Sequence, residues 1–131
     1  GDWITGVLEK NGAKVRTTIP EEGGLQWTES FSIGKGTQNY DMARKWIQWI
    51  TSAEGQAKSA DMAAYPALIP NNKGWEVLNA TNPAEAKRQN MVLGQYNAMD
   101  MIREGRIRYR QLPVQQSLED WNDFWSDYKG A

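Results

Sequence analysis

The segment from residue 25 to 33 alternates in the way of a strand that is buried on one side. The residues on its apolar face are Leu25, Trp27, Glu29, Phe31 and Ile33. This face places an acid between two aromatic residues, and a carboxylate removed from water needs a cationic or hydrogen-bonding partner. Either the strand is short and Glu29 reaches solvent or an internal partner, or a bound cation neutralises it.

Helical periodicity covers much of the remaining chain. Apolar residues recur three and four positions apart between Tyr40 and Trp49, and Trp46 and Trp49 are expected in the core. Capping sequences begin at Thr51, Asn82 and Ser117. The helices expected are 2–10, 40–49, 51–62, 73–78, one from 82, a looser one over 91–102 and a last one from 117. The stripe of the last helix, Leu118, Trp121, Phe124, Trp125 and Tyr128, needs a partner surface.

Few strands accompany these helices. Besides 25–33, the β-branched run Val15–Ile19, closed by Pro20, is expected to be a strand. The prolines make 65–70 extended, and 108–113 is also expected to be extended. The class is therefore α/β, helix-rich and with too few strands to cover seven tryptophans. A complete protein is expected to supply more sheet.

Composition excludes several kinds of function. The net charge is −1 and the short basic run Arg103–Arg110 is interrupted by Glu104 and Gly105, which makes it a solvated helix end and argues against nucleic-acid binding. The chain has no cysteine and no histidine, so disulfides, thiol nucleophiles, Ser-His-Asp chemistry and ordinary zinc sites are excluded. We expect no metal, no cofactor and no enzymatic activity.

Two features concern the limits of the chain. No apolar run approaches the roughly 20 residues that a membrane span requires. The sequence starts at Gly1 without a signal peptide, so we expect it to be a piece of a longer protein.

The block Glu-Gly-Gly-Leu-Gln-Trp-Thr-Glu-Ser-Phe-Ser-Ile, followed by an Ala-Arg-Lys-Trp-Ile helix, Tyr-Pro and a late Gln before an aromatic helix, resembles one known family. It is similar to the C-terminal portion of the spermidine/putrescine-binding proteins of bacterial ABC importers. The resemblance covers nearly the whole chain. It implies a two-lobed periplasmic-binding fold of type II, of which this chain would be an incomplete part.

The resemblance also implies a set of ligand-binding residues. Trp27 matches a tryptophan that stacks on the ligand, and Glu29 matches an aspartate that pairs with an ammonium group of the polyamine. Trp3 matches a second aromatic wall. Tyr65 matches an aromatic residue near a crossing between lobes, and Gln111 matches a hydrogen-bonding glutamine. The sequence departs from the family in having Glu instead of Asp at 29 and a longer interval from Tyr65 to Gln111.

The domain division and the partners follow from the same resemblance. Residues 1–27 would belong to the second lobe, 28–70 to the first lobe, and 71–131 would return to the second. The expected partners are a small cationic solute, an ABC permease of the inner membrane, and either the missing N-terminal portion or a second copy. The location would be periplasmic or otherwise extracytoplasmic.

Two alternatives come from other classes of protein. A carbohydrate-binding module or carboxylate glycosidase would stack sugars on Trp3, Trp27 or Trp75, although the adjacent Glu21 and Glu22 point apart in an extended chain and do not form a catalytic pair. A helical interaction module would instead use the final helix. Titration with amines and with a neutral sugar separates these alternatives.

Overall fold

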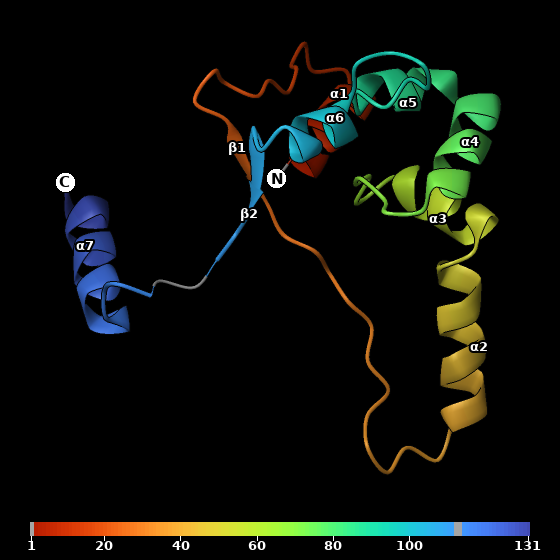
Figure 1. Cartoon of the computed structure of the whole chain (residues 1–131), viewed down its shortest axis with the longest axis horizontal. Helices are drawn as coiled ribbons and strands as arrows, with labels where there is room; N and C mark the ends of the chain where they lie inside the picture. Colours follow the sequence, from red (N-terminus) through yellow and green to blue (C-terminus); the bar gives the residue numbers. More distant parts are fainter. Residues whose placement is uncertain (1, 112–113) are drawn as a thin grey trace.

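The computed structural model describes residues 2–111 and 114–131 (Figure 1). In these residues, helices carry most of the regular structure and two short strands pair with each other. The elements are α1 (Trp3–Lys10), β1 (Gly24–Gln26), α2 (Tyr40–Ile50), α3 (Ala53–Ala60), α4 (Asn72–Thr81), α5 (Pro83–Arg88), α6 (Ala98–Arg103), β2 (Ile107–Tyr109) and α7 (Leu118–Gly130). Every helix in the described part is too short or too polar to cross a lipid bilayer.

The hydrophobic core lies among α3, α4, α5 and α6. Trp75 on α4 is 1% exposed, and its indole N–H donates to the backbone oxygen of Ile69 at 2.7 Å. Gly74 allows α3 and α4 to pack closely, because a Cβ there would lie 2.8 Å from Cβ of Gln56. The buried residues of this core are Ala57, Ala60, Ile69, Trp75, Leu78, Ala86, Met91 and Ala98.

The capping residues explain where the core helices begin. Ser52, not Thr51, caps α3: its hydroxyl accepts from the backbone N–H of Gly55, whereas the Thr51 hydroxyl donates back to Ile47 at the end of α2. Asn82 caps α5, with Pro83 in the first turn as expected.

The predicted ends of the helices were less accurate than their starts. Helix α3 stops at Ala60 and α4 runs to Thr81. Of the expected helix 91–102 only residues 98–102 are helical, within α6, which ends at Arg103.

The two strands are parallel, with Gln26 opposite Tyr109. The prediction of a strand over 25–33 was wrong beyond Gln26, because β1 pairs with β2 alone in the described residues and nothing extends the ladder past that point. The strand expected at Val15–Ile19 was also wrong, since this run is irregular and pairs with no strand in the described part of the chain. The basic run does not form one helix end, because α6 stops at Arg103 and β2 begins at Ile107. Of the segment 108–113, Leu112 and Pro113 lie outside the described residues.

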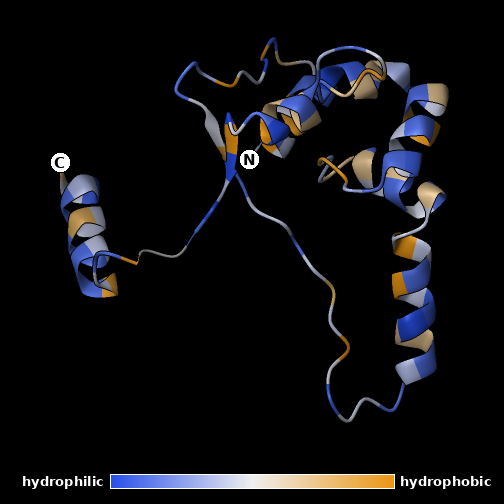
Figure 2. Ribbon diagram, in the orientation of Figure 1, coloured by the Kyte–Doolittle hydropathy of each residue, from blue (hydrophilic) through white to orange (hydrophobic). Residues whose placement is uncertain are grey.

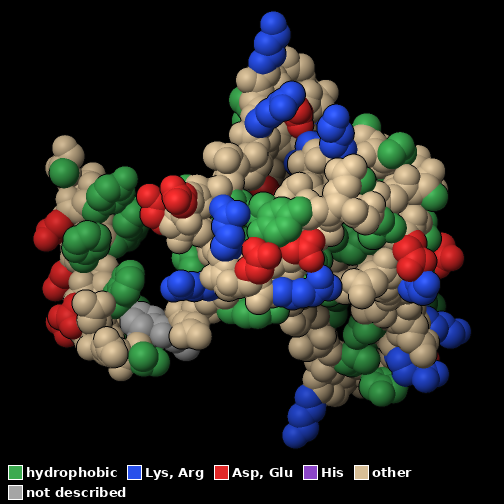
Figure 3. Space-filling view, turned by 45° about the horizontal axis from the view of Figure 1, so that its top comes forward, with side chains coloured by type: hydrophobic (Ala, Val, Ile, Leu, Met, Phe, Trp, Pro, Cys, Tyr) green, Lys and Arg blue, Asp and Glu red, His purple; other side chains and the backbone are tan. Residues whose placement is uncertain are grey.

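Two helices keep large apolar side chains in solvent. Figure 2 shows apolar bands along α2, and both α2 and α7 stand away from the core in Figure 1. The prediction that Trp46 and Trp49 are core residues was wrong: they are 50% and 47% exposed and pack against each other at 5.4 Å between ring centroids. Figure 3 shows hydrophobic side chains gathered on α7, where the expected stripe is exposed throughout.

Candidate functional site

An aromatic pair and an acid from three separate segments meet beside α1. The phenol of Tyr65 donates to Oε1 of Glu29 at 3.0 Å, across 36 residues of sequence. The ring of Tyr65 also packs against that of Trp3, with centroids 4.8 Å apart and planes 31° apart. We refer to Trp3, Glu29 and Tyr65 as the aromatic–acid cluster.

Local sequence places each member of the cluster. Trp3 is the first residue of α1, which ends where Gly12 takes a φ of +87°. Tyr65 heads the extended segment before Pro66, whose side chain is fully buried and holds this segment against the helices. Glu29 follows β1 in an extended stretch that leaves its side chain exposed. The cluster therefore combines one helix end and two extended segments.

The electrostatics of the cluster keep Tyr65 as a donor. The hydrogen bond to Glu29, followed by desolvation and the negative charge of that carboxylate, raises the pKa of Tyr65 above its ordinary value of 10.0. The phenol is neutral at pH 7 even at its ordinary pKa, and the upward shift extends the pH range over which it donates to the carboxylate. Because a carboxylate has room for several hydrogen bonds, Glu29 retains the capacity to bind a further donor.

Trp27 and Gln111 lie at the carboxyl ends of the paired strands. The backbone N–H of Arg110 donates to the backbone oxygen of Gln26 at 2.8 Å, so the segments that follow β1 and β2 leave the sheet side by side. Trp27 is 50% exposed and Gln111 is exposed. Among the described residues, neither side chain makes a hydrogen bond or ring contact with the cluster. The structure thus brings together three of the five expected site residues and leaves these two at the neighbouring strand ends.

A hollow of about 440 Å³ opens beside Glu29. Its lining includes the apolar Phe31, Ile47 and Pro70 and the polar Gln56. The amide nitrogen of Gln56 donates to the Ile50 oxygen at 2.8 Å, which fixes the orientation of the amide, while the buried Oε1 has no hydrogen-bond partner among the described residues.

Sequence reasoning overlooked a group of largely buried polar residues on and just after α5, namely Glu85, Arg88 and Gln89. Glu85 is 4% exposed and accepts three hydrogen bonds from Arg88 as well as one from Gln89. Burial raises the pKa of Glu85, but the hydrogen bonds and the charge of Arg88 outweigh it and leave the pKa below its ordinary value of 4.5. The spacing of Glu85 and Arg88, one helical turn apart, was a signal in the sequence.

The acidic residues do not gather into a metal site. In the described ranges no three of them come close enough together to hold a metal ion. The aromatic–acid cluster itself presents one carboxylate beside a phenol and an indole, so negative charge lies next to aromatic faces.

Comparison with known proteins identifies the family. No curated protein and no solved structure matches the chain. Residues 1–87, about two thirds of the sequence, match the family described as bacterial extracellular solute-binding protein. This chain therefore belongs to the bacterial extracellular solute-binding proteins, the non-enzymatic components of ABC importers that bind a solute outside the cytoplasm and partner a membrane permease.

Proposed function

We propose that this protein captures a small cationic solute of the polyamine class, with the aromatic–acid cluster as the centre of its site. The observation that carries the proposal is the meeting of Trp3, Tyr65 and Glu29 from three separate segments. The three residues converge while the Glu29 side chain stays exposed, which is what a site for an external cation requires.

The chemistry of the cluster favours an amine over a neutral sugar. An ammonium group donates to Glu29 and cancels its charge, and a nearby indole or phenol face adds a cation–π attraction of about 0.5–2 kcal/mol. A neutral sugar would stack on the rings but would leave the carboxylate charge uncompensated as water is excluded. The methylene chain of a polyamine fits the same aromatic surfaces.

Trp27 and Gln111 support this placement of the site. Both follow the carboxyl ends of parallel strands, and in open α/β sheets ligands bind outside those ends. In the proposed complex Trp27 stacks on the solute and Gln111 orients it by hydrogen bonding. Their exposure in this chain leaves them accessible for that role.

The proposed architecture is the two-lobed type II fold, without the expected lobe boundary at residue 70, because Ala57 and Ile69 share one hydrophobic core with Trp75. The exposed apolar faces of α2 and α7 support this proposal, because a lobe completed by further polypeptide, or by a second copy, would cover them. Closure of the two lobes would exclude water and strengthen the contact between Glu29 and the solute as the effective dielectric falls. The closed complex would then be recognised by the permease.

Calorimetric titration of the full-length protein with putrescine, spermidine and a neutral sugar tests the proposal. We expect heat from the amines alone. The substitution Glu29→Gln keeps the size of the side chain and removes its charge, and it should weaken amine binding at least tenfold, roughly the value of a charge-assisted hydrogen bond. Glu21→Gln, which neutralises an exposed acid of the neighbouring loop, serves as the matched control. Binding of the sugar, or amine binding that survives Glu29→Gln unchanged, would contradict the proposal.

A further inference from the structure

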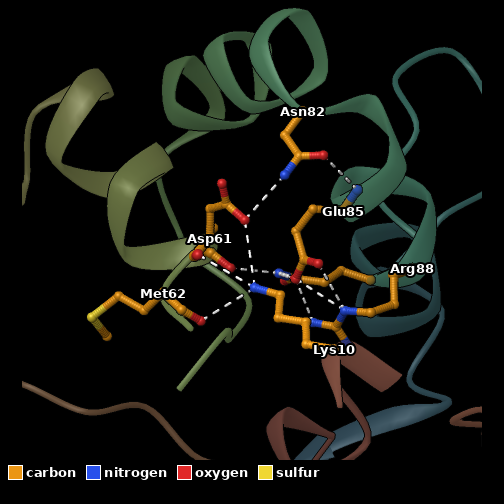
Figure 4. Close-up of polar contacts among 8 residues, drawn as sticks. Lys10, Asp61, Met62, Asn82, Glu85 and Arg88 are labelled. Carbon is orange, nitrogen blue, oxygen red and sulfur yellow. Dashed lines mark hydrogen bonds and ion pairs between the residues drawn. The ribbon is translucent and has the colours of Figure 1, made fainter. Parts of the chain in front are cut away.

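Helix α1 is anchored at two points on one face. Gly6 is buried, and a Cβ built there would lie 2.7 Å from Cζ of Arg88 and 2.7 Å from Cγ of Pro66. Lys10 reaches the end of α3, where its Nζ donates to the backbone oxygens of Asp61 and Met62 at 3.4 Å and lies 3.6 Å from the Asp61 carboxylate. Figure 4 shows the contacts of Lys10.

The two anchors are joined by hydrogen bonds behind the helix. The Asp61 carboxylate accepts from the side chain of Asn82 at 3.1 Å, and Asn82 in turn caps α5 through the backbone N–H of Glu85. The Glu85 carboxylate holds the guanidinium of Arg88 at 2.6–3.0 Å (Figure 4). The Arg88 side chain is only 12% exposed, so this planar group is a fixed surface for Gly6.

The same helix face carries a wall of the candidate site. Trp3 precedes Gly6 by three residues and Lys10 by seven, so the three lie along one side of α1. Tyr65 precedes Pro66 directly. The contact of Gly6 with Pro66 and the contact of Trp3 with Tyr65 are therefore successive contacts between the same two segments, and a shift at the first moves the second.

We infer that Gly6 and the Glu85–Arg88 pair are positioning residues that set the separation between the Trp3 and Tyr65 rings, and through it the affinity for the solute. The inference rests on the proposed function, because it assigns these residues a task at that site. None of the three is a member of the aromatic–acid cluster. They act by fixing the distance from α1 to the segment that carries Tyr65.

Two substitutions test the inference in the full-length protein. Gly6→Ala adds a methyl group that has no room beside Arg88 and Pro66, yet alanine is the better helix former, so any effect arises from displacement of α1 rather than from its unfolding. Arg88→Lys keeps the positive charge but removes the planar guanidinium, which donates two hydrogen bonds side by side. This variant tests the inference independently if Gly6→Ala does not fold. Arg103→Lys is the matched control, since Arg103 pairs with Asp100 at the same helical spacing on an exposed surface.

Two measurements separate positioning from general destabilisation. The ¹⁹F resonance of Trp3, assigned in fluorotryptophan-labelled protein by comparison with Trp3→Phe, reports the ring current of Tyr65 in the folded state. Putrescine titration reports affinity. We expect both Gly6→Ala and Arg88→Lys to shift the resonance and to weaken putrescine binding about tenfold, because loss of a residue that holds a binding group in place typically lowers affinity by at least this factor. Arg103→Lys should change neither the resonance nor the affinity.

The outcomes distinguish this inference from the proposed function. An unshifted Trp3 resonance and unaltered putrescine affinity in Gly6→Ala and Arg88→Lys would overturn the inference and leave the proposed function intact. A protein that binds no amine would overturn the proposed function and with it the role in affinity, even where the resonance shifts.

Discussion

The core formed by α3 to α6 and the C-terminal helix α7 have similar sequence patterns, but only the core has its apolar side chains covered. Trp75 on α4 is 1% exposed, whereas Trp125 on α7 is 54% exposed and contacts its own helix, stacking on Tyr128 at 5.5 Å with Lys129 over its ring. Both helices have a capped start. Periodicity and capping therefore suffice to define a helix, and burial requires a second surface.

The two regions should differ most in the stability that is lost when a tryptophan is removed. Trp75→Ala leaves a cavity in the core and an unpaired Ile69 oxygen, so it should lower the free energy of unfolding by about 3–5 kcal/mol. Trp125→Ala should change it by no more than about 0.5 kcal/mol. Urea denaturation followed by circular dichroism measures both. Equal losses would show that α7 is packed on the core in solution.

A smaller effect is expected from the buried ion pair of α5. Glu85→Gln leaves Arg88 without a counter-charge and should cost about 2 kcal/mol at neutral pH. Because the folded-state pKa of Glu85 is lowered, its contribution to stability is fully present above the ordinary value of 4.5 and is lost as the pH falls through the folded-state pKa.

Denaturation at several pH values checks this pH dependence. The unaltered protein should lose more stability on acidification than Glu85→Gln does. Glu76→Gln, which alters the exposed pair with Lys73, should follow the unaltered protein. If Glu85→Gln kept the acid slope of the unaltered protein, the ion pair of Glu85 and Arg88 would not be the source of that slope.

The smallest effect concerns the two serine caps. Ser52→Ala removes the acceptor for the backbone N–H of Gly55 at the start of α3 and should cost about 1 kcal/mol in unfolding of the core. Ser117→Ala removes the equivalent acceptor for Asp120 on α7, and it should reduce helix content without moving the unfolding midpoint of the core. A midpoint shifted by Ser117→Ala would show that α7 and the core unfold as one unit.

The family resemblance named five candidate residues, whereas residue chemistry alone pointed to Trp27 with Glu29, so the two signals coincided only on that pair. Trp3, Glu29 and Tyr65 were identified from their types and order, and the structure brings them into contact. Gly6 and the Glu85–Arg88 pair were not identified, because their importance depends on which segments lie against α1. The unpaired Oε1 of Gln56 had no signal in the sequence at all.

By itself the sequence determined the local elements, since capping residues, prolines and three-to-four spacing act within a few residues. It predicted α1, α2 and the starts of α5 and α7 from these signals. The extent of the strand predicted over 25–33 and the exposure of Trp46 and Trp49 were decided by the tertiary structure. A strand exists only where a second strand accepts its hydrogen bonds, and a tryptophan is buried only where another surface covers it.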